Sequence, residues 1–320
     1  MMEPYAIHFA PLQGYTDSVY REAHAQIFGG VETYYTPFVR LEKGGFRNKE
    51  LRDLAPEANT SASLVPQMIA ASPEEFRRIA GLFRESGYRR ADINLGCPFP
   101  MQARQHRGAG ILPYPDEVKA LLETIFEFPE IQFSVKLRLG WDSSDEAQAL
   151  LPFLNGLPLT HLTLHPRIGT QQYKGETDQK AFSRFYDSCS LPLFYNGDIR
   201  TLPDIRLLAG RFPRLKGIML GRGLLSSPWL ATEYISDIPL TAQEKKEKLS
   251  AFHTLLIAGY SSRLEGGEHQ ILDKIKTLWD YLLPDAEKRL RKKVLKSSRL
   301  ADYQEAVRNL IYDTSITAGQ

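Results

Sequence analysis

The sequence has few cysteines and no long apolar run. Only Cys97 and Cys189 occur among 320 residues, which excludes a disulfide framework and a four-cysteine zinc site. No 18 consecutive uncharged apolar residues are present, and no Lys or Arg precedes the short apolar run near the start. We therefore expect neither a membrane span nor a secretion signal. The low cysteine usage favours a reducing compartment, so we expect a cytoplasmic protein.

The whole chain has almost no excess of one sign of charge, but one short segment has such an excess. The chain has 40 Lys and Arg against 38 Asp and Glu, a net charge of +2, which does not by itself indicate a nucleic-acid partner. Residues 288–299 nevertheless hold seven basic side chains and no acidic one: Lys288, Arg289, Arg291, Lys292, Lys293, Lys296 and Arg299. Such a run is usually a solvated helix face, and contact with nucleic acid is the alternative.

Eight short apolar or β-branched runs alternate with helical segments over the first 240 residues. The runs cover residues 6–10, 32–36, 63–67, 91–95, 133–137, 161–165, 193–196 and 217–220. This alternation is typical of parallel βαβ units. Eight units favour a TIM (β/α)8 barrel, because a doubly wound sheet has about six strands and a glycine-rich first turn. The segment Pro11–Asp17 after the first run lacks the G-x-G-x-x-G pattern of such a turn.

Beyond Pro239 the pattern is helical only. We predict helices over residues 241–264, 271–283, 284–296 and 301–314. The fold class is therefore α/β: a barrel domain over residues 1–240, followed by a small all-helical domain over residues 241–320.

Polar residues gather at the carboxyl ends of the predicted strands, where barrel enzymes carry their chemistry. These residues are Gln67, Asn94, Gly96, Cys97, Lys136, Arg138, His165, Arg167, Asn196, Gly197, Asp198, Gly221, Arg222 and Gly223. Each alone has an ordinary explanation, such as a helix cap or a tight turn. Lys136, however, is flanked by apolar residues, and burying a lysine without a partner is costly. We expect an anionic ligand or a carboxylate beside it.

Two features among these residues indicate specific chemistry. Asn196-Gly197-Asp198 and Gly221-Arg222-Gly223 end the last two strands, with a helix expected near Leu224. That pattern is typical of the phosphate site of barrels, and a pair of turns is the alternative. Cys97 lies at a strand exit and is a candidate nucleophile or proton donor, against the alternative of a structural thiol. No third ligand accompanies His161 and His165, so we expect no metal site.

Taken in order, these motifs resemble the tRNA-dihydrouridine synthases, a flavin-dependent family. The matching segments are 10–17, 66–67, 94–98, 107–110, 135–140, 165–167, 172–175, 196–199 and 221–223. The sequence departs from the family pattern at Leu12 and Gln13, where a Met and a small residue are usual. It departs again at Pro166, where the family has Gly. Neither departure removes a chemical group.

The resemblance implies a barrel followed by a helical RNA-binding domain, with FMN as cofactor, NADPH or NADH as reductant and tRNA as substrate. It implies no membrane, no metal and no obligate protein partner. Carried over by position, the cofactor contacts are Pro11, Leu12, Gln13, Gln67, Lys136, His165, Asn196, Gly197, Asp198, Gly221 and Arg222. The substrate contacts are Asn94, Arg138, Lys292 and Lys293. His165 belongs either to the phosphate side of the flavin or to the substrate side.

The implied reaction reduces the C5–C6 double bond of a tRNA uridine. Hydride passes from N5 of reduced FMN to C6, and Cys97 gives a proton to C5. A thiol with an ordinary pKa of about 8.5 is mostly protonated near neutral pH, which suits a general acid. Lys136 near the N1 edge of the flavin would stabilise the anionic reduced ring.

Two alternatives remain at this point. A flavin barrel acting on a small pyrimidine, as dihydroorotate or dihydropyrimidine dehydrogenases do, shares the phosphate motif but needs no basic helical tail. A non-catalytic RNA-binding barrel would keep the tail. It would have no need of Cys97, Lys136 and the Asn196 and Arg222 phosphate pair together.

Overall fold

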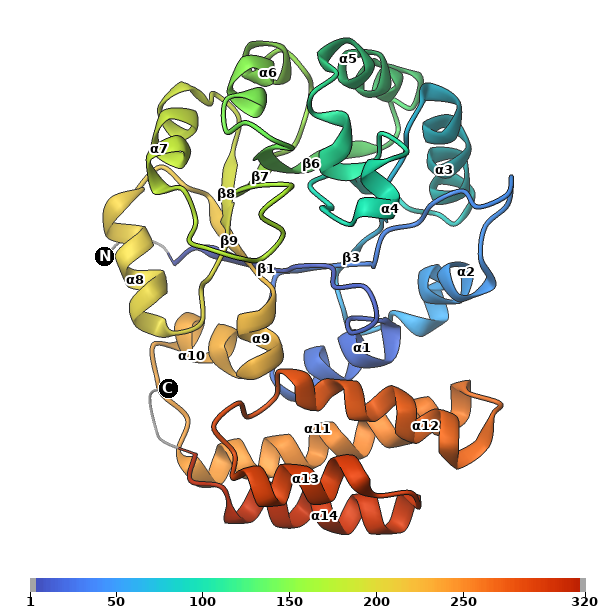
Figure 1. Ribbon diagram of the computed structural model, residues 1–320, viewed down its shortest axis with the longest axis vertical. Helices are drawn as coiled ribbons and strands as arrows, with labels where there is room; N and C mark the ends of the chain where they lie inside the picture. Colours follow the sequence, from blue (N-terminus) through green and yellow to red (C-terminus); the bar gives the residue numbers. More distant parts are fainter. Residues whose placement is uncertain (1–3, 317–320) are drawn as a thin grey trace.

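The computed structural model describes residues 4–316, so residues 1–3 of the predicted barrel and 317–320 of the predicted helical domain lie outside it. Its strands form one parallel sheet in the order β3-β2-β1-β9-β8-β7-β6-β5-β4 (Figure 1). The strands are β1 (Ala6–Phe9), β2 (Thr33–Tyr35), β3 (Leu64–Val65), β4 (Gln67–Met68), β5 (Arg90–Leu95), β6 (Gln132–Gly140), β7 (Leu162–Ile168), β8 (Leu193–Asn196) and β9 (Gly217–Leu220).

Pro66 divides the third predicted strand into β3 and β4. Proline has no N–H to donate, so it interrupts the strand ladder at this point. Strand β3 pairs with β2, and β4 pairs with β5. Because β3 and β4 are joined only by Pro66, this segment connects the two ends of the sheet order and closes a barrel. The predicted barrel of eight strand segments is confirmed.

Strands β6 and β7 are longer than predicted. They pair as far as Gly140 and Ile168, with a register shift between Arg138 and Gly140. The neighbouring strands β5 and β8 end earlier, at Leu95 and Asn196. The extension therefore carries Arg138 beyond the carboxyl end of its neighbour β5, to the rim of the barrel.

Helices surround the barrel (Figure 1). They are α1 (Ser18–Ile27), α2 (Asn48–Leu54), α3 (Pro73–Glu85), α4 (Pro100–Ala103), α5 (Pro115–Glu123), α6 (Glu146–Asn155), α7 (Gln179–Ser188), α8 (Leu202–Arg211), α9 (Arg222–Ser226) and α10 (Leu230–Ser236). Short 3-10 helices are η1 (Pro56–Ala58), η2 (Gly108–Ile111) and η3 (Thr124–Glu127). Helix α3 begins as predicted, with Ser72 as N-cap and Pro73 at the first position.

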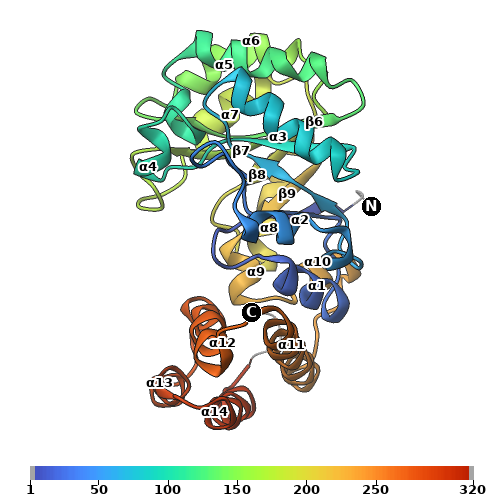
Figure 2. The same ribbon diagram turned by 90° about the vertical axis from the view of Figure 1, so that its right-hand side faces the viewer.

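The chain ends in α11 (Ala242–Arg263), α12 (Gly267–Lys276), η4 (Thr277–Asp280), α13 (Lys288–Lys296) and α14 (Leu300–Asp313). These helices lie together on one side of the barrel (Figure 2). The helix predicted from Pro284 starts only at Lys288, because Leu283 adopts a left-handed φ of 49° and ends the preceding turn. None of the helices in residues 4–316 is long and apolar enough to cross a membrane.

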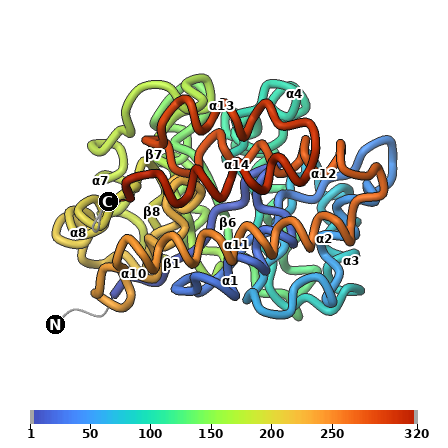
Figure 3. The backbone as a smooth tube through the Cα atoms, turned by 90° about the horizontal axis from the view of Figure 1, so that it is seen from below, coloured from blue at the N-terminus to red at the C-terminus, as the bar shows by residue number. Residues whose placement is uncertain are grey.

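Helix α11 packs directly on the barrel helix α1, and the two run close together in Figure 3. The Phe252 ring lies edge-on to Tyr20 and Phe28, at centroid distances of 5.3 and 5.4 Å. Lys248 Nζ donates a hydrogen bond to the carbonyl of Ile27 at 2.7 Å. One hydrophobic core contains residues of both the barrel and the terminal helices.

Candidate active site

A chain of hydrogen bonds links β4 and β5 to the loop that carries Cys97. Ser134 Oγ donates to Asp92 Oδ1 at 2.6 Å, and Gln67 Nε2 donates to Asp92 Oδ2 at 2.7 Å. Asn94 Nδ2 donates to Gln67 Oε1 at 2.7 Å. Asn94 Oδ1 in turn accepts the backbone N–H of Cys97 at 2.8 Å. The predicted residues Gln67 and Asn94 are thus oriented by a buried carboxyl group, Asp92, that sequence reasoning missed.

The strand register explains why these side chains meet. Gln67 lies opposite Asp92, Asp92 opposite Ser134, and Asn94 opposite Lys136. Because side chains alternate along a strand, Asp92 shares its face of β5 with Asn94, as Ser134 does with Lys136 on β6. The spacing of Asp92 two residues before Asn94 was the available signal for its role.

Lys136 is half-buried at the barrel mouth, and its ammonium group forms no hydrogen bond or ion pair with any residue from 4 to 316. Burial and then Arg138 lower the pKa of Lys136 to about 8, while Asp92 and Cys97 oppose that shift. Burial raises the pKa of Asp92 to about 6, against the effect of its hydrogen bonds and of Lys136. A half-buried cation without a direct partner suits an anionic ligand.

Cys97 lies half-buried between β5 and α4. Burial raises the pKa of its thiol, and the Phe99 backbone, Arg138 and Lys136 lower it to a smaller extent. A raised pKa keeps the thiol protonated at neutral pH, as a proton donor requires. Gly108, with φ +62°, packs against this residue so closely that a Cβ would lie 2.8 Å from Cys97 Cβ. Only glycine allows the two segments to approach in this way.

Tyr173 lies between two arginines at the rim, a position that sequence reasoning missed. The guanidinium carbons of Arg138 and Arg222 lie 5.3 and 4.9 Å from the centre of its ring, as in cation–π contacts. Cys97 is close enough to raise the pKa of the Tyr173 hydroxyl group. Tyr173 thus links the cysteine side of the mouth to the Arg222 side. It falls within the matched segment 172–175, which was the available signal.

Arg167 and Arg222 share one carboxylate, that of Asp198. Both donate to it, Arg222 Nη2 at 3.1 Å, and Arg167 also donates to His165 Nε2 at 3.2 Å. Burial and the neighbouring cations hold the pKa of His165 well below its ordinary value, so the ring is neutral near pH 7. Because Asp198 is itself an acceptor, its side chain cannot donate to a phosphate. Only its backbone N–H is available for that purpose.

The turns after β8 and β9 converge with the loop after β1. Asn196 Nδ2 donates to a β9 carbonyl at 2.7 Å. A Cβ on Gly223 would lie 2.2 Å from the Ile199 carbonyl oxygen, so α9 packs directly against the turn after β8. A Cβ on Gly221 would lie 3.9 Å from Leu12 Cδ1. Gly197 lies beside His165, whose Cδ2 would be 3.4 Å from an added Cβ.

The loop after β1 also touches the terminal helices. Gln13 Nε2 donates to the Phe38 carbonyl at 3.2 Å, which directs this side chain toward the segment after β2. Lys274 Nζ pairs with Asp17 Oδ2 at 2.9 Å, and Tyr15 donates to Asp280 at 3.0 Å. Pro11, Leu12 and Gln13 therefore lie where the barrel mouth meets α12 and η4.

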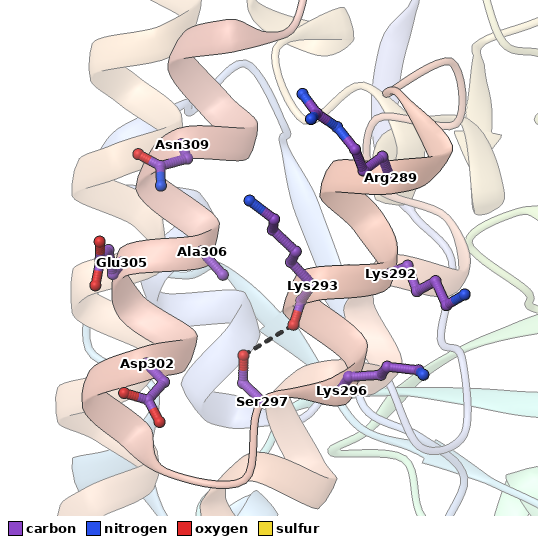
Figure 4. A pocket seen from close by; sticks show the side chains of 9 residues that line it. All are labelled: Arg289, Lys292, Lys293, Lys296, Ser297, Asp302, Glu305, Ala306 and Asn309. Atoms are coloured by element: carbon purple, nitrogen blue, oxygen red, sulfur yellow. Dashed lines mark hydrogen bonds between the residues drawn. The ribbon is translucent and has the colours of Figure 1, made fainter.

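Lys292 and Lys293 belong to a separate surface. They lie on α13, where with Arg289 and Lys296 they line a groove of about 490 Å³ against α14 (Figure 4). The far side of this groove carries Asp302, Glu305 and Asn309. No group of three or more His, Cys, Asp or Glu side chains within residues 4–316 is arranged to hold a metal ion.

Solved structures share the barrel. The old yellow enzyme from Trypanosoma cruzi matches with a TM-score of 0.52 and 12% identity, covering 73% of this chain and 89% of its own. Morphinone reductase matches with a TM-score of 0.50 and 14% identity, covering 74% and 86%. At these identities the likeness shows the fold alone.

Curated sequences give the family. The tRNA-dihydrouridine synthase B of Pasteurella multocida is 27% identical over 225 residues, which are 70% of this chain and 67% of the relative. The tRNA-dihydrouridine(16) synthase of Pseudomonas putida is 31% identical over 239 residues, 71% and 72% of the two chains. The family model for dihydrouridine synthase (Dus) matches residues 8–311. The chain therefore belongs to the dihydrouridine synthase family.

Proposed function

We propose that this protein reduces the C5–C6 double bond of a uridine in tRNA, with FMN as cofactor and NADPH or NADH as reductant. The observation that carries the proposal is the meeting of three groups at one barrel mouth. They are the protonated thiol of Cys97, the unpartnered ammonium of Lys136 and the linked amides of Gln67 and Asn94. Membership of the family and relatives named tRNA-dihydrouridine synthase support the choice of substrate.

The donor set at the mouth suits FMN. The fully buried Gln67 donates one N–H to Asp92, and its second N–H has no acceptor within the described chain. Lys136 supplies a positive charge opposite Asn94, which is hydrogen-bonded to Gln67. On the phosphate side, Arg167 Nε is buried without a hydrogen-bond partner, and Arg222 lies next to it around Asp198. Bound there, FMN would supply the hydride for C6 of the uracil ring.

The protein's own part in the reaction is to hold and deliver a proton. Cys97 keeps its proton near pH 7 because burial raises its pKa, and we assign it the transfer to C5. The positive charges of Arg138 and Lys136 favour the thiolate that remains. We assign Asn94 and Arg138 to the target nucleotide, since both side chains are fixed at the mouth by hydrogen bonds.

We further propose that the terminal helices form the RNA-binding domain over residues 241–320. Two basic residues of α13 already have partners in the protein. Arg291 donates to the carbonyls of Trp279, Leu282 and Leu283, and Arg289 forms an ion pair with Glu287. Five basic residues of the run are exposed and form no ion pair within the described chain: Lys288, Lys292, Lys293, Lys296 and Arg299. Such side chains hold phosphates and position an RNA without reading its sequence.

A tRNA substrate also gives a role to α13, which forms a separate surface from the mouth. A uridine stacked in folded RNA must be drawn out of the stack before a buried group can react with it. Contacts elsewhere on the RNA offset that cost. Both cysteines are free, which accords with the cytoplasmic location that we propose.

Two measurements test this function. Purified protein should be yellow and release FMN, and tRNA from cells lacking the protein should lose dihydrouridine at defined positions that the restored gene recovers. A colourless preparation that cannot be reconstituted would exclude the flavin. An unchanged dihydrouridine map combined with oxidation of dihydroorotate or a dihydropyrimidine would favour a small-pyrimidine enzyme instead.

A further inference from the structure

An exposed aromatic residue follows closely after Cys97 in the chain. Phe99 follows Cys97 by two residues, and 55% of its surface is exposed. Met101 on α4 is exposed to 54%. No acidic residue occurs from Cys97 to Pro115, and the segment includes the exposed Arg104. Apolar side chains left in solvent beside a reactive site indicate a contact surface.

The backbone presents this ring rigidly. Phe99 lies between Pro98 and Pro100, with φ −69° and ψ 122°, and both prolines restrict the backbone. Helix α4 packs tightly against η2, since a Cβ on Gly110 would lie 2.4 Å from Ala103 Cα. A ring on such a backbone loses little conformational freedom when a partner covers it.

A groove of about 490 Å³ continues from α4. Met101 and Gln105 line one side, and Arg40, Lys43 and Arg78 line the other. Of its three acidic members, Glu42 and Glu75 pair with Arg40 and Arg107, and Glu74 is exposed. Lys43 and Arg78 are also exposed and form no ion pair within the described chain. Phe99 lies two residues before Met101, at the start of α4, so an exposed aromatic ring adjoins a groove with exposed cations. Surfaces that bind unpaired nucleic-acid strands typically combine aromatic and cationic groups.

The views in Figures 2 and 3 place α4 on the same side of the molecule as α13. One RNA molecule covering the mouth can therefore reach both the basic run on α13 and the ring of Phe99. The two surfaces have different composition. Helix α13 carries mainly lysine and arginine, whereas the α4 surface has the exposed apolar residues Phe99 and Met101 beside a groove of mixed charge.

We infer that Phe99 stacks on a base of the substrate RNA next to the target uridine and takes the place that the uridine leaves. This inference rests on the proposed function. Withdrawing one base from a stack exposes the faces of its neighbours, and an aromatic side chain restores that contact whatever the neighbouring base is. Lys43 and Arg78 hold phosphates of the same strand. Phe99 is thus a positioning residue for the RNA, and Cys97 remains the proton donor.

The test uses the full-length, FMN-loaded protein and an unmodified tRNA transcript. Phe99→Ala should lower kcat/KM for dihydrouridine formation roughly tenfold, the effect of removing about one base–aromatic stacking interaction. Its FMN content and its rate of reduction by NADPH without RNA should equal those of the wild type. Phe126→Ala is the matched control, because Phe126 is 60% exposed on η3, which precedes β6 at the opposite end of the barrel.

Tryptophan at position 99 gives a second readout that does not depend on turnover. Phe99→Trp should retain activity, and its added fluorescence should be quenched by the transcript, whereas that of Phe126→Trp should not. Equal turnover in the Phe99→Ala and Phe126→Ala proteins, with unquenched Phe99→Trp, overturns the inference alone. So does a Phe99→Ala protein that loses self-association but keeps full activity, since a second copy would then cover the ring. A wild type that forms no dihydrouridine overturns the proposed function as well.

Discussion

At the scale of single residues, Asp92 orients the polar side chains at the barrel mouth. Both of its oxygens accept hydrogen bonds, from Ser134 and Gln67, and Gln67 passes the orientation on to Asn94. Because a carboxylate only accepts, it fixes which end of the Gln67 amide faces the barrel interior. Asp92 also acts on Lys136 by charge, since it raises the pKa of that ammonium group.

This arrangement predicts a bell-shaped pH dependence of kcat/KM with its maximum between about pH 6 and pH 8. Asp92, whose pKa is raised to about 6, loses its negative charge as the pH falls through that value. Lys136, whose pKa is lowered to about 8, loses its positive charge as the pH rises through that value. Initial rates with tRNA across pH 5 to 9.5 measure both limbs.

The variant Asp92→Asn tests whether Asp92 causes the acid limb of the pH profile. The variant should lack the acid limb, and its alkaline limb should move to lower pH because Lys136 loses a stabilising charge. Ser134→Ala is the control, since it removes a hydrogen bond to Asp92 but not the charge. An acid limb that persists unchanged in Asp92→Asn would contradict this assignment.

The sequence predicted which strand ends carry the candidate site, but not all of its residues. Gln67, Asn94, Cys97 and Lys136 meet as expected because parallel strands end at the same rim. Asp92 was missed because it lies one layer deeper, inside a strand. Tyr173 was given no role because only the folded loop brings it between Arg138 and Arg222.

At the scale of elements, the close packing of α9 against the turn after β8 shapes the proposed phosphate site. Gly223→Ala should force these elements apart, since the new Cβ would meet the Ile199 carbonyl oxygen at 2.2 Å. We expect a decrease of about 1–3 kcal/mol in the free energy of unfolding. FMN should also dissociate more readily. Denaturant unfolding and FMN content after gel filtration measure the two effects.

Gly210→Ala in α8 is the matched control for that substitution. Nothing lies within 4 Å of a Cβ at this position, so alanine should be neutral or stabilise the helix by up to about 1 kcal/mol. Equal stability and FMN retention in Gly223→Ala and Gly210→Ala would show that the packing of α9 on the turn has no such role.

Element boundaries followed the sequence only where local signals decide them. The start of α3 was predictable because Ser72 and Pro73 supply a cap and a fixed φ. The start of α13 was not, because the turn before Pro284 includes Leu283 with a left-handed φ, and Arg291 donates to the carbonyls of Leu282 and Leu283 only in the folded chain. Pro66 marks the break in the third strand, but the alternation of runs alone gave no reason to split it.

At the scale of the whole molecule, the barrel and the terminal helices share a core. Phe252→Ala should therefore destabilise the entire chain by about 3–5 kcal/mol in a single unfolding transition, because its ring contacts Tyr20 and Phe28 of the barrel. Thermal and denaturant unfolding followed by two probes test this. Leu207→Ala, at a 74% exposed position, should change little. A separate low-temperature transition with an unaffected barrel would contradict a shared core.

The position of α13 makes a second prediction at this scale. Lys292→Glu with Lys293→Glu should weaken tRNA binding and flatten its dependence on salt, since each phosphate that the protein no longer neutralises lowers the steepness of log K against log salt by about 0.7–0.9. Lys119→Glu with Lys180→Glu, on α5 and α7, makes the same charge change on other helices and should have a smaller effect. Equal affinities and equal salt dependences for the two double variants would show that α13 does not bind the RNA.

The most direct test of the central claim, that a flavin and the Cys97 thiol act at one mouth, is a single-turnover measurement. Pre-reduced enzyme is mixed with unmodified tRNA transcript, and dihydrouridine is quantified over time. Cys97→Ala should retain FMN and form dihydrouridine at least about a hundredfold more slowly than the wild type, the usual contribution of a general acid. A Cys97→Ala protein that reacts at the wild-type rate would contradict the claim.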